Sequence, residues 1–494
     1  MATDRTRGFA SPAGPPPNDT PTRRLDFRRK SSGTIPKRSW PALSVVGHLF
    51  DRVDSAYFLL FPGWESELRG NRWHFAVRWA VHKPVVLVIP TLQGVPSRSE
   101  PEPRIPNCRI LLIQSVGAPE QIVKDTQIQV GQILDDMADH GFERPLLWCY
   151  NWMLAGPLAR LPAVARLLHA TEAHFDMPGL SHYLDRLSAA VTISDLTVAV
   201  SDGVAAGLRG RVDRGEILTV TNGCDYRFYS AGKADQALAA KRGSYSRIAV
   251  YAGNINSRLD FDLVHRLASQ CPDVLFALFG PSSSLTETDA KAWKEILKLT
   301  NVFAPGPVDP DRLPDLYAAA DVGLIPYRQD PWLVENALPL KALEMGATGL
   351  PVVASLMKPL AGLAAGVVVT WSADEFAAAF ERTSRASLSA DQLRELDAVS
   401  AANDYDHKFK QIIEALDSRV VSARPTTRVD EFLEVLGPQW FDAEAQLYRS
   451  LAVSQPVRIK RLLIDALIRL APKPLKRRIR SSRLRRAVRG LRGS

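Results

Sequence analysis

The sequence is poor in cysteine. It has four cysteines in 494 residues, and no two of them have the CxxC spacing of a zinc or dithiol motif. We therefore expect a reduced protein in the cytoplasm, without a disulfide framework or a structural zinc site. The sequence also lacks a run of about eighteen apolar residues, so no transmembrane helix is expected. The first twenty residues have no apolar segment, which argues against a secretory signal.

Acidic residues are scarce at the two ends of the chain. Residues 456–494 hold fourteen lysines and arginines against Asp465 alone, a net charge of +13, and residues 1–40 carry +6. Because the whole chain carries only +9, the residues between the two ends are acidic on balance. The excess positive charge therefore lies at the two ends of the chain and not in its globular body.

The basic C-terminal segment has three interpretations. It contains a helical apolar stripe formed by Ile459, Leu462, Leu463, Ala466, Leu467 and Leu470. An amphipathic helix with a polybasic extension favours peripheral binding to an anionic membrane surface, here the inner face. A nucleic-acid arm is the second interpretation, but the segment has no aromatic residue to stack on bases, so no nucleic acid is expected as a partner. A merely solvated end is the third.

The body of the chain alternates between continuous apolar runs of strand length and segments of helix length. The first such series begins after residue 40, and the second begins with residues 247–253. Buried apolar strands that alternate with helices predict an α/β protein with two doubly wound, Rossmann-like parallel sheets facing a cleft. The predicted segments are a disordered N-terminus at 1–40, domains at 41–228 and 229–400, a crossover helix at 401–420, and a helical extension with the polybasic tail at 421–494.

The stretch that best suggests a function is LVENALPLKALEMGATGLPVVAS, residues 333–355. It predicts a polar loop, a short helix, a glycine turn and a buried strand. Lys341 and Glu344 lie three residues apart on that helix and so share a face. A lysine at a helix N-terminus can hold a phosphate, and a carboxylate one turn later can accept hydrogen bonds from a ribose. The alternative interpretation is a solvated surface pair.

Several segments resemble the donor-binding half of a GT-B glycosyltransferase, similar to the bacterial polysaccharide-type group 1. The similar segments are YAGNINSRLDFDLVHRLA at 251–268, NVFAPGPVDPDRLPDLYAAADVGLIPY at 301–327, and the P-x-K-x-x-E element with its G-x-P-V-V strand at 339–353. Upstream, VTNGCDYRFY at 220–229 resembles the segment that leads into this half. The resemblance is strong over the second half of the chain and loose over the first.

The resemblance implies a hexosyltransferase that moves a sugar from a nucleotide-sugar donor to a glycan or lipid-linked acceptor, without a metal cofactor. The second domain would hold the nucleoside diphosphate and the first would present the acceptor. On this basis the ribose would be bound by Glu344, and the donor phosphates by Lys341, Arg258, Gly253, Asn254, Asn336 and the backbone of residues 336–340. For Arg258, a solvated arginine at a helix start is the alternative.

One residue departs from the family pattern. Many members carry a glutamate eight residues before the second one, but Asn336 occupies that position here and Glu335 stands beside it. The sugar and the anomeric outcome of the reaction are therefore left open. The pairs Asp260/Asp262 and Asp404/Asp406 have the DxD spacing of metal-bound donors, but the first pair lies at a predicted helix start, where acidic caps are expected.

Two clusters in the first domain are candidates for contacts in the cleft. Arg69, Asn71, Arg72 and His74 surround a glycine just before a helix, where substrate contacts are expected from the resemblance; a helix cap with a surface basic pair is the alternative. A second cluster, Glu172, His174 and Asp176, follows a predicted strand, where catalytic groups project in this architecture. Either carboxylate is a candidate general base for an acceptor hydroxyl, and His174 is a candidate to hold the sugar or diphosphate.

Two other classes of function remain open at this stage. A GT-B-fold nucleotide-sugar epimerase would need carboxylates in the cleft for elimination chemistry and no lipid-facing tail. A non-catalytic nucleotide-sugar-binding scaffold is favoured by the missing first glutamate and disfavoured by Lys341 with Glu344. Fold alone does not choose among them.

Overall fold

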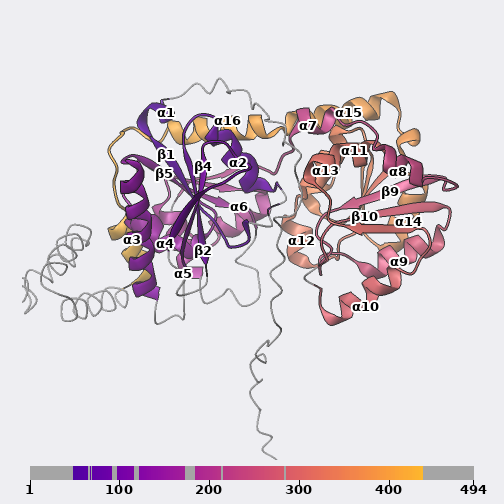
Figure 1. The fold of residues 1–494 in the computed structure, drawn as a ribbon, viewed down its shortest axis with the longest axis horizontal. Coiled ribbons are helices and arrows are strands. Elements are labelled where there is room, and N and C mark those ends of the chain that lie inside the picture. Colours follow the sequence, from indigo (N-terminus) through magenta and orange to yellow (C-terminus); the bar gives the residue numbers. More distant parts are fainter. Residues whose placement is uncertain are drawn as a thin grey trace, which may run out of the picture. The chain divides into compact units, whose positions relative to one another are not determined.

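The computed structural model describes residues 48–64, 67, 69–91, 97–115, 122–172, 184–212, 215–282 and 285–437. The chain separates into two units between Trp40 and Pro41, and every described residue belongs to the second unit. This unit contains two sheets, each with its own helices (Figure 1). The predicted N-terminal segment and the predicted basic tail lie outside the described residues. Within those residues, no helix has the length and apolarity needed to cross a membrane.

The first sheet has eight strands in the described part of the chain, in the order β3-β4-β2-β1-β5-β6-β7-β8. Neighbouring strands are parallel except β3 and β4. The strands are β1 (Ser55–Leu59), β2 (Val85–Thr91), β3 (Arg98–Pro101), β4 (Cys108–Gln114), β5 (Pro145–Cys149), β6 (Ala165–Ala170), β7 (Leu196–Ala199) and β8 (Ile217–Thr219).

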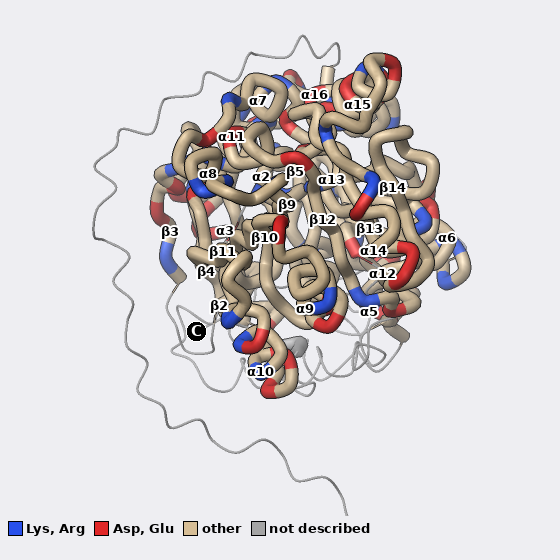
Figure 2. Tube along the Cα trace, turned by 90° about the vertical axis from the view of Figure 1, so that its right-hand side faces the viewer, with Lys and Arg blue, Asp and Glu red and all other residues tan. Residues whose placement is uncertain are grey.

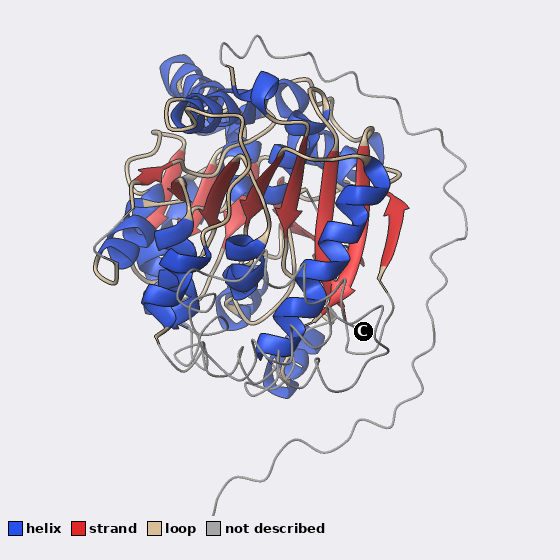
Figure 3. Ribbon diagram, turned by 90° about the vertical axis from the view of Figure 1, so that its left-hand side faces the viewer, coloured by secondary structure: helices blue, strands red, loops and turns tan. Residues whose placement is uncertain are grey.

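Helices cover both faces of this sheet because its strands are apolar on both sides (Figure 3). In β1, Tyr57 and Leu59 belong to the core under one face, whereas Phe58 stacks on Trp148 at 5.0 Å on the other. The helices of this part are α1 (Leu49–Arg52), α2 (Asn71–Ala80), α3 (Ile122–His140), α4 (Ala155–Arg160), α5 (Leu184–Ile193) and α6 (Asp202–Arg209), with a 3₁₀ turn at Trp152–Leu154.

The second sheet is wholly parallel, with the order β11-β10-β9-β12-β13-β14. Alternate residues of β9 enter opposite cores: Ile248 and Val250 pack on one face, Ala249 and Tyr251 on the other. The strands are β9 (Arg247–Ala252), β10 (Val274–Phe279), β11 (Val302–Gly306), β12 (Val322–Ile325), β13 (Val352–Ser355) and β14 (Val367–Thr370).

Acidic and basic residues are interspersed along the chain around the second sheet, without a large region of one sign (Figure 2). The helices of this part are α7 (Tyr226–Ser230), α8 (Gln236–Lys241), α9 (Phe261–Gln270), α10 (Glu287–Ile296), α11 (Leu313–Ala318), α12 (Pro331–Asn336), α13 (Leu340–Ala347), α14 (Ala373–Arg382) and α15 (Ala390–Ala402). Short 3₁₀ helices span Pro310–Arg312, Lys358–Leu360 and Arg385–Ser387. The predicted polar loop before α13 is instead largely the helix α12.

After α15 the chain returns to the first sheet. Helix α16 (Tyr405–Asp417) packs on α2, and α17 (Val429–Leu436) packs on α4 and α5. Four apolar residues of α17 enter the core of the first sheet: Val429, Phe432, Leu433 and Leu436. Helices α16 and α17 therefore pack on the first domain, whereas residues 421–494 were predicted to form a separate helical extension. The spacing of the four residues is that of one helical face, but the core that receives it is formed by distant residues.

The first aspartate of each DxD pair is a helix cap in the structure. Asp260 Oδ1 accepts a hydrogen bond of 2.9 Å from the backbone N–H of Leu263, at the start of α9. Asp404 caps α16 in the same way by accepting from the N–H of Asp406 at 2.6 Å. Such a side chain satisfies one of the backbone donors left open in the first turn.

Replacing Asp260 by alanine is expected to lower the free energy of unfolding by about 1 kcal/mol, because the cap of α9 is lost. Urea unfolding of the purified protein would measure the change. Asp262→Ala is the matched control, since Asp262 is an exposed residue in the same first turn. Equal destabilisation by the two substitutions would contradict the capping role of Asp260.

Candidate functional site

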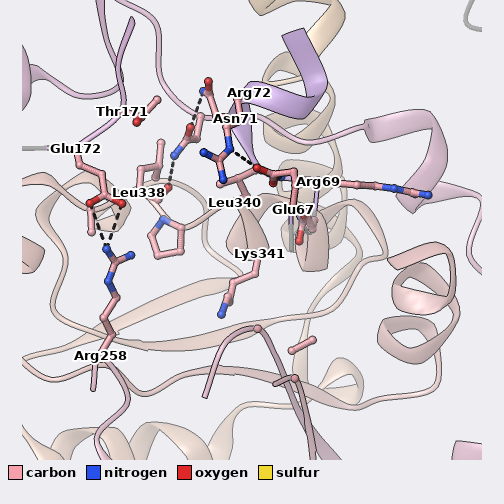
Figure 4. A pocket seen from close by; sticks show the side chains of 18 of the residues that line it. Glu67, Arg69, Asn71, Arg72, Thr171, Glu172, Arg258, Leu338, Leu340 and Lys341 are labelled. Carbon is pink, nitrogen blue, oxygen red and sulfur yellow. Dashed lines mark hydrogen bonds and ion pairs between the residues drawn. The ribbon is translucent and has the colours of Figure 1, made fainter. Parts of the chain in front are cut away.

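A cavity of about 620 Å³ is lined by residues that follow the strand ends of both sheets (Figure 4). From the first sheet come the start of α2, Tyr150 after β5, and Glu172 after β6. From the second come Gly253 after β9, Tyr327 after β12, and residues of α12 and α13. The carboxyl edges of parallel sheets are where ligands bind in doubly wound folds, so this cavity is the candidate site.

Lys341 extends from the first turn of α13 into the cavity (Figure 4). Its Nζ donates to the Tyr327 hydroxyl at 3.0 Å and lies 4.2 Å from the ring centre of Tyr251. No ion pair of the described residues involves Lys341; the acidic side chain that feels its charge is Glu344, one turn later on α13. Burial raises the pKa of the Tyr327 hydroxyl, but the cations Lys341 and Arg258 more than offset this and hold that pKa below its usual value.

Glu344 is buried in the wall of the same cavity, one helical turn beyond Lys341. Burial raises the pKa of its carboxyl group to about 7, against the opposing effects of a hydrogen bond with Tyr229 and the charge of Lys341. The predicted common face of the two residues is thus present in the structure. Near pH 7 the side chain is divided between a carboxylate, which accepts hydrogen bonds, and an acid, which can also donate one.

Two glycines after neighbouring strands shape the floor of the cavity. Gly253 has φ +152°, and a Cβ atom there would collide with Lys341 Nζ. Gly280 has φ +147°, and a Cβ atom there would collide with the Gly253 carbonyl oxygen. These positions exclude other side chains and let the lysine approach the backbone after β9. Asn254 does not line the cavity; its carbonyl accepts a 2.8 Å bond from Tyr251.

Arg258, in the loop before α9, forms an ion pair with Glu172 of the opposite wall (Figure 4). One terminal nitrogen of the arginine donates to both carboxylate oxygens, at 3.1 and 3.3 Å. The guanidinium group also lies 5.0 Å from the ring centre of Trp332 in α12. Both predicted residues therefore line the cavity, and each is the other's partner.

The departure at position 336 has a structural counterpart. Asn336 lines the cavity, and its amide nitrogen donates to the Trp332 carbonyl at 3.0 Å. Glu335 does not replace the missing glutamate, because it forms an exposed ion pair with Lys358 at 2.6 Å. A Cβ atom at Gly203 would collide with Asn336, so α6 of the first domain approaches this position closely.

Three of the four residues predicted near the start of α2 line the cavity: Arg69, Asn71 and Arg72. Arg69 has a left-handed backbone (φ 62°) and pairs with Asp311 of the second domain at 2.7 Å. Arg72 pairs with Glu67 and lies over the Trp64 ring. His74 is not part of the lining; its buried ring stacks on Tyr405 of α16 at 4.1 Å. Asn71 and Arg72 therefore face the cavity, whereas His74, two positions after Arg72, lies on the face of α2 that packs on α16.

Two polar residues outside the predicted clusters, Tyr150 and Asn222, link the two walls through Asn71. The Tyr150 hydroxyl donates to Asn71 Oδ1 at 3.2 Å, and Asn71 Nδ2 donates to Asn222 Oδ1 at 2.9 Å. Asn222 Nδ2 in turn donates to the Leu338 carbonyl at 2.9 Å, just before α13. This chain of bonds holds the segment that leads into α13. The Asn222-Gly223 pair was a visible turn signal, but its partners are distant in sequence.

Two predicted residues, His174 and Asp176, lie outside the described residues. Among the residues that are described, no three His, Cys, Asp or Glu side chains gather closely enough to hold a metal ion. The cavity instead presents the cations Lys341, Arg258, Arg69 and Arg72, together with the carboxyl groups of Glu67, Glu172 and Glu344. Such a set suits an anionic ligand that also has hydroxyl groups.

The second half of the chain is similar to a known protein family. Residues 246–385 match the family model Glycosyl transferases group 1. The second sheet lies within the matched residues. The match contains β9 to β14 and the helix α13 with Lys341 and Glu344, so the resemblance predicted from the motifs is confirmed there.

A curated relative is similar over a stretch of the same length. The chain is 35% identical over 140 residues to TuaH of Bacillus subtilis (strain 168), which is named as a teichuronic acid biosynthesis glycosyltransferase. The match covers 28% of this chain and 34% of TuaH, so the chain spans about a third of the length of that relative.

Solved structures are similar over more of the chain. Sucrose-phosphate synthase from Thermosynechococcus elongatus has a TM-score of 0.51 at 17% identity and covers 81% of this chain and 100% of its own. Anabaena HepE in complex with UDP and glucose has a TM-score of 0.52 at 16% identity, covering 74% and 100%. The E. coli trehalose-6-phosphate protein bound with UDP-2-fluoro glucose has a TM-score of 0.55 at 12% sequence identity. The match covers 74% of this chain and 99% of the E. coli chain. These likenesses confirm the predicted fold of two Rossmann-like sheets (GT-B) and nothing beyond it.

Proposed function

We propose that the protein is a glycosyltransferase that moves a hexosyl group from a nucleoside-diphosphate sugar to a glycan or lipid-linked acceptor. The observation that carries this proposal is the joint position of Lys341 and Glu344: one helix brings an ammonium group without an ion-pair partner among the described residues and a buried carboxyl group to the same cavity. A diphosphate needs the first and a ribose needs the second. The group 1 match over these residues supports the same assignment.

The proposed reaction breaks the bond between the sugar C1 and the diphosphate oxygen and forms a bond from C1 to an acceptor hydroxyl oxygen, whose proton passes to a base. Negative charge develops on the departing diphosphate. Lys341 and Arg258 would stabilise that charge in the cavity, where water is partly excluded. Glu344 would hold the ribose, and the first-domain wall with Arg69, Asn71 and Arg72 would hold the acceptor. Glu172 and Asp176 remain the predicted candidates for the base.

The test is a binding and turnover screen of UDP-, GDP- and dTDP-sugars, with and without EDTA. Two of the similar solved structures are complexes with UDP and glucose and with UDP-2-fluoro glucose, so UDP-sugars are the first to try. Saturable binding of one donor that is lost in Lys341→Ala and Glu344→Ala supports the proposal. Absence of binding by every donor would rule out the transferase. Binding without sugar transfer would favour the scaffold, and interconversion of the donor without transfer would favour the epimerase.

We also propose that the basic C-terminal segment places the enzyme on an anionic membrane surface at the cytoplasmic side. The support is its composition: residues 456–494 carry +13, with apolar residues at helical spacing in the first half. Each cation near such a surface contributes about 1 kcal/mol of attraction.

The full chain is therefore expected to sediment with vesicles of anionic phospholipid in 100 mM salt and to be released at about 500 mM, because salt screens surface charge. A variant that ends after residue 455 should remain in the supernatant while it retains donor binding. Equal sedimentation with neutral vesicles would contradict an electrostatic attachment, and binding to duplex DNA in place of vesicles would favour the nucleic-acid interpretation.

A further inference from the structure

The two cations on the second-domain wall of the cavity differ in one respect. Lys341 has no ion-pair partner within the described part of the chain, whereas Arg258 is paired with Glu172 of the first domain. The pair joins the loop before α9 to the loop after β6, 86 residues apart in sequence. Both side chains are part-exposed to the cavity, at 40% and 37%. Glu172 thus forms an ion pair with one of the two cations that would bind the phosphates of the proposed donor.

The arginine of this pair is a residue type that binds both carboxylates and phosphates. An arginine nitrogen that reaches two carboxylate oxygens uses the same planar donor group that binds phosphate oxygens. The Trp332 ring, at 5.0 Å from the guanidinium group, limits the directions from which Arg258 can be approached. Because the pair is part-exposed, water competes with it, and a ligand with a higher charge can displace the carboxylate.

We propose that Glu172 is a specificity-determining residue that competes with the ligand's phosphate for Arg258. In the ligand-free protein its carboxylate takes the position of a phosphate group, and a ligand must supply enough negative charge to displace it. The competition discriminates a nucleoside diphosphate from an uncharged nucleoside. This inference rests on the proposed function, because it assumes that the diphosphate of the donor enters this cavity.

The test is a calorimetric titration of the full-length protein with UDP, GDP, dTDP and uridine. Glu172→Gln is expected to bind the preferred nucleoside diphosphate about two- to fivefold more tightly than the wild type, because the competing charge is removed. Uridine, which has no phosphate, is expected to bind equally to both. Glu335→Gln is the control for net charge, since Glu335 pairs with Lys358 in an exposed position on α12; it should not change the affinity.

A second substitution separates competition from simple repulsion. In an Arg258→Gln background, Glu172→Gln should no longer improve binding, because no shared partner is left. If the gain persists there, Glu172 acts only by repelling the ligand, and the inference is wrong. Unchanged affinity with a strongly reduced turnover would likewise overturn it and assign Glu172 to catalysis. If the wild type binds none of the three diphosphates, the proposed function fails, and the inference fails with it; binding by the wild type without a gain in Glu172→Gln refutes the inference alone.

Discussion

Lys341→Ala is expected to lower kcat/KM for the donor about a hundredfold. The substitution removes an ammonium group that has no carboxylate partner among the described residues and that lines the cavity beside Gly253. In the proposed reaction this charge would be most valuable as the diphosphate departs, because negative charge is then greatest. Loss of a single stabilising group of this kind costs about two to three orders of magnitude in rate. Initial rates at several donor concentrations would measure the effect.

Two further variants make the result specific. Lys358→Ala removes an exposed lysine that pairs with Glu335 of α12. This variant should keep kcat/KM within about twofold of the wild type. Lys341→Arg should restore activity only in part, because a planar guanidinium group does not reproduce the position of the compact ammonium group between Gly253 and the rings of Tyr251 and Tyr327. A loss of less than about threefold in Lys341→Ala would mean that the phosphates lie elsewhere.

Glu344→Gln is expected to stabilise the ligand-free protein at pH 8 and to change its stability little at pH 4.5. Burial raises the pKa of Glu344 from 4.5 to about 7 in the folded state. Between pH 4.5 and about pH 7 the folded state binds more protons than the unfolded state, so the free energy of unfolding falls as the pH rises. The ionised side chain thus costs about 3 kcal/mol above pH 7. Glutamine keeps an acceptor for Tyr229 without this cost.

Chemical unfolding of the wild type and Glu344→Gln at pH 4.5, 6 and 8 would test this expectation. The difference between the two proteins should appear between pH 4.5 and 7 and then level off. Glu295→Gln is a suitable control, since Glu295 is an exposed partner of Lys298 and its removal should not create a new pH dependence. Glu344→Gln should also weaken nucleotide binding severalfold at pH 8, where the Glu344 carboxylate would bind the ribose. A difference in stability independent of pH would contradict the raised pKa.

The sequence predicted the second half of the chain more fully than the first. The signals there are local: continuous apolar strands, a glycine after β9, an acidic cap before α9, and a lysine and a glutamate one turn apart on α13. Each depends on residues within a few positions, so no tertiary contact is needed to recognise it. The resemblance to the group 1 family rests on the same stretches, and the family match covers these residues.

In the first half the same reasoning identified the correct segment but not each residue's role. At the start of α2 the predicted cluster lines the cavity through Arg69, Asn71 and Arg72, whereas His74 faces Tyr405 of α16. Which face of a helix meets a cavity depends on what packs against the other face, and here that is a helix more than 300 residues later in the chain.

The sequence by itself determined the α/β alternation, the two sheets and the helix that carries Lys341 and Glu344, because apolar periodicity and turn residues act over short distances. The tertiary structure alone decided three further features: the pairing of Arg258 with Glu172, the hydrogen-bonded chain from Tyr150 to Leu338, and the return of α17 to the first sheet. The hydrogen bonds of the first two features join residues 79 to 151 positions apart, and α17 packs on helices more than 200 positions earlier in the chain. Such contacts form only when the folded sheets bring the segments together, so no local pattern encodes them.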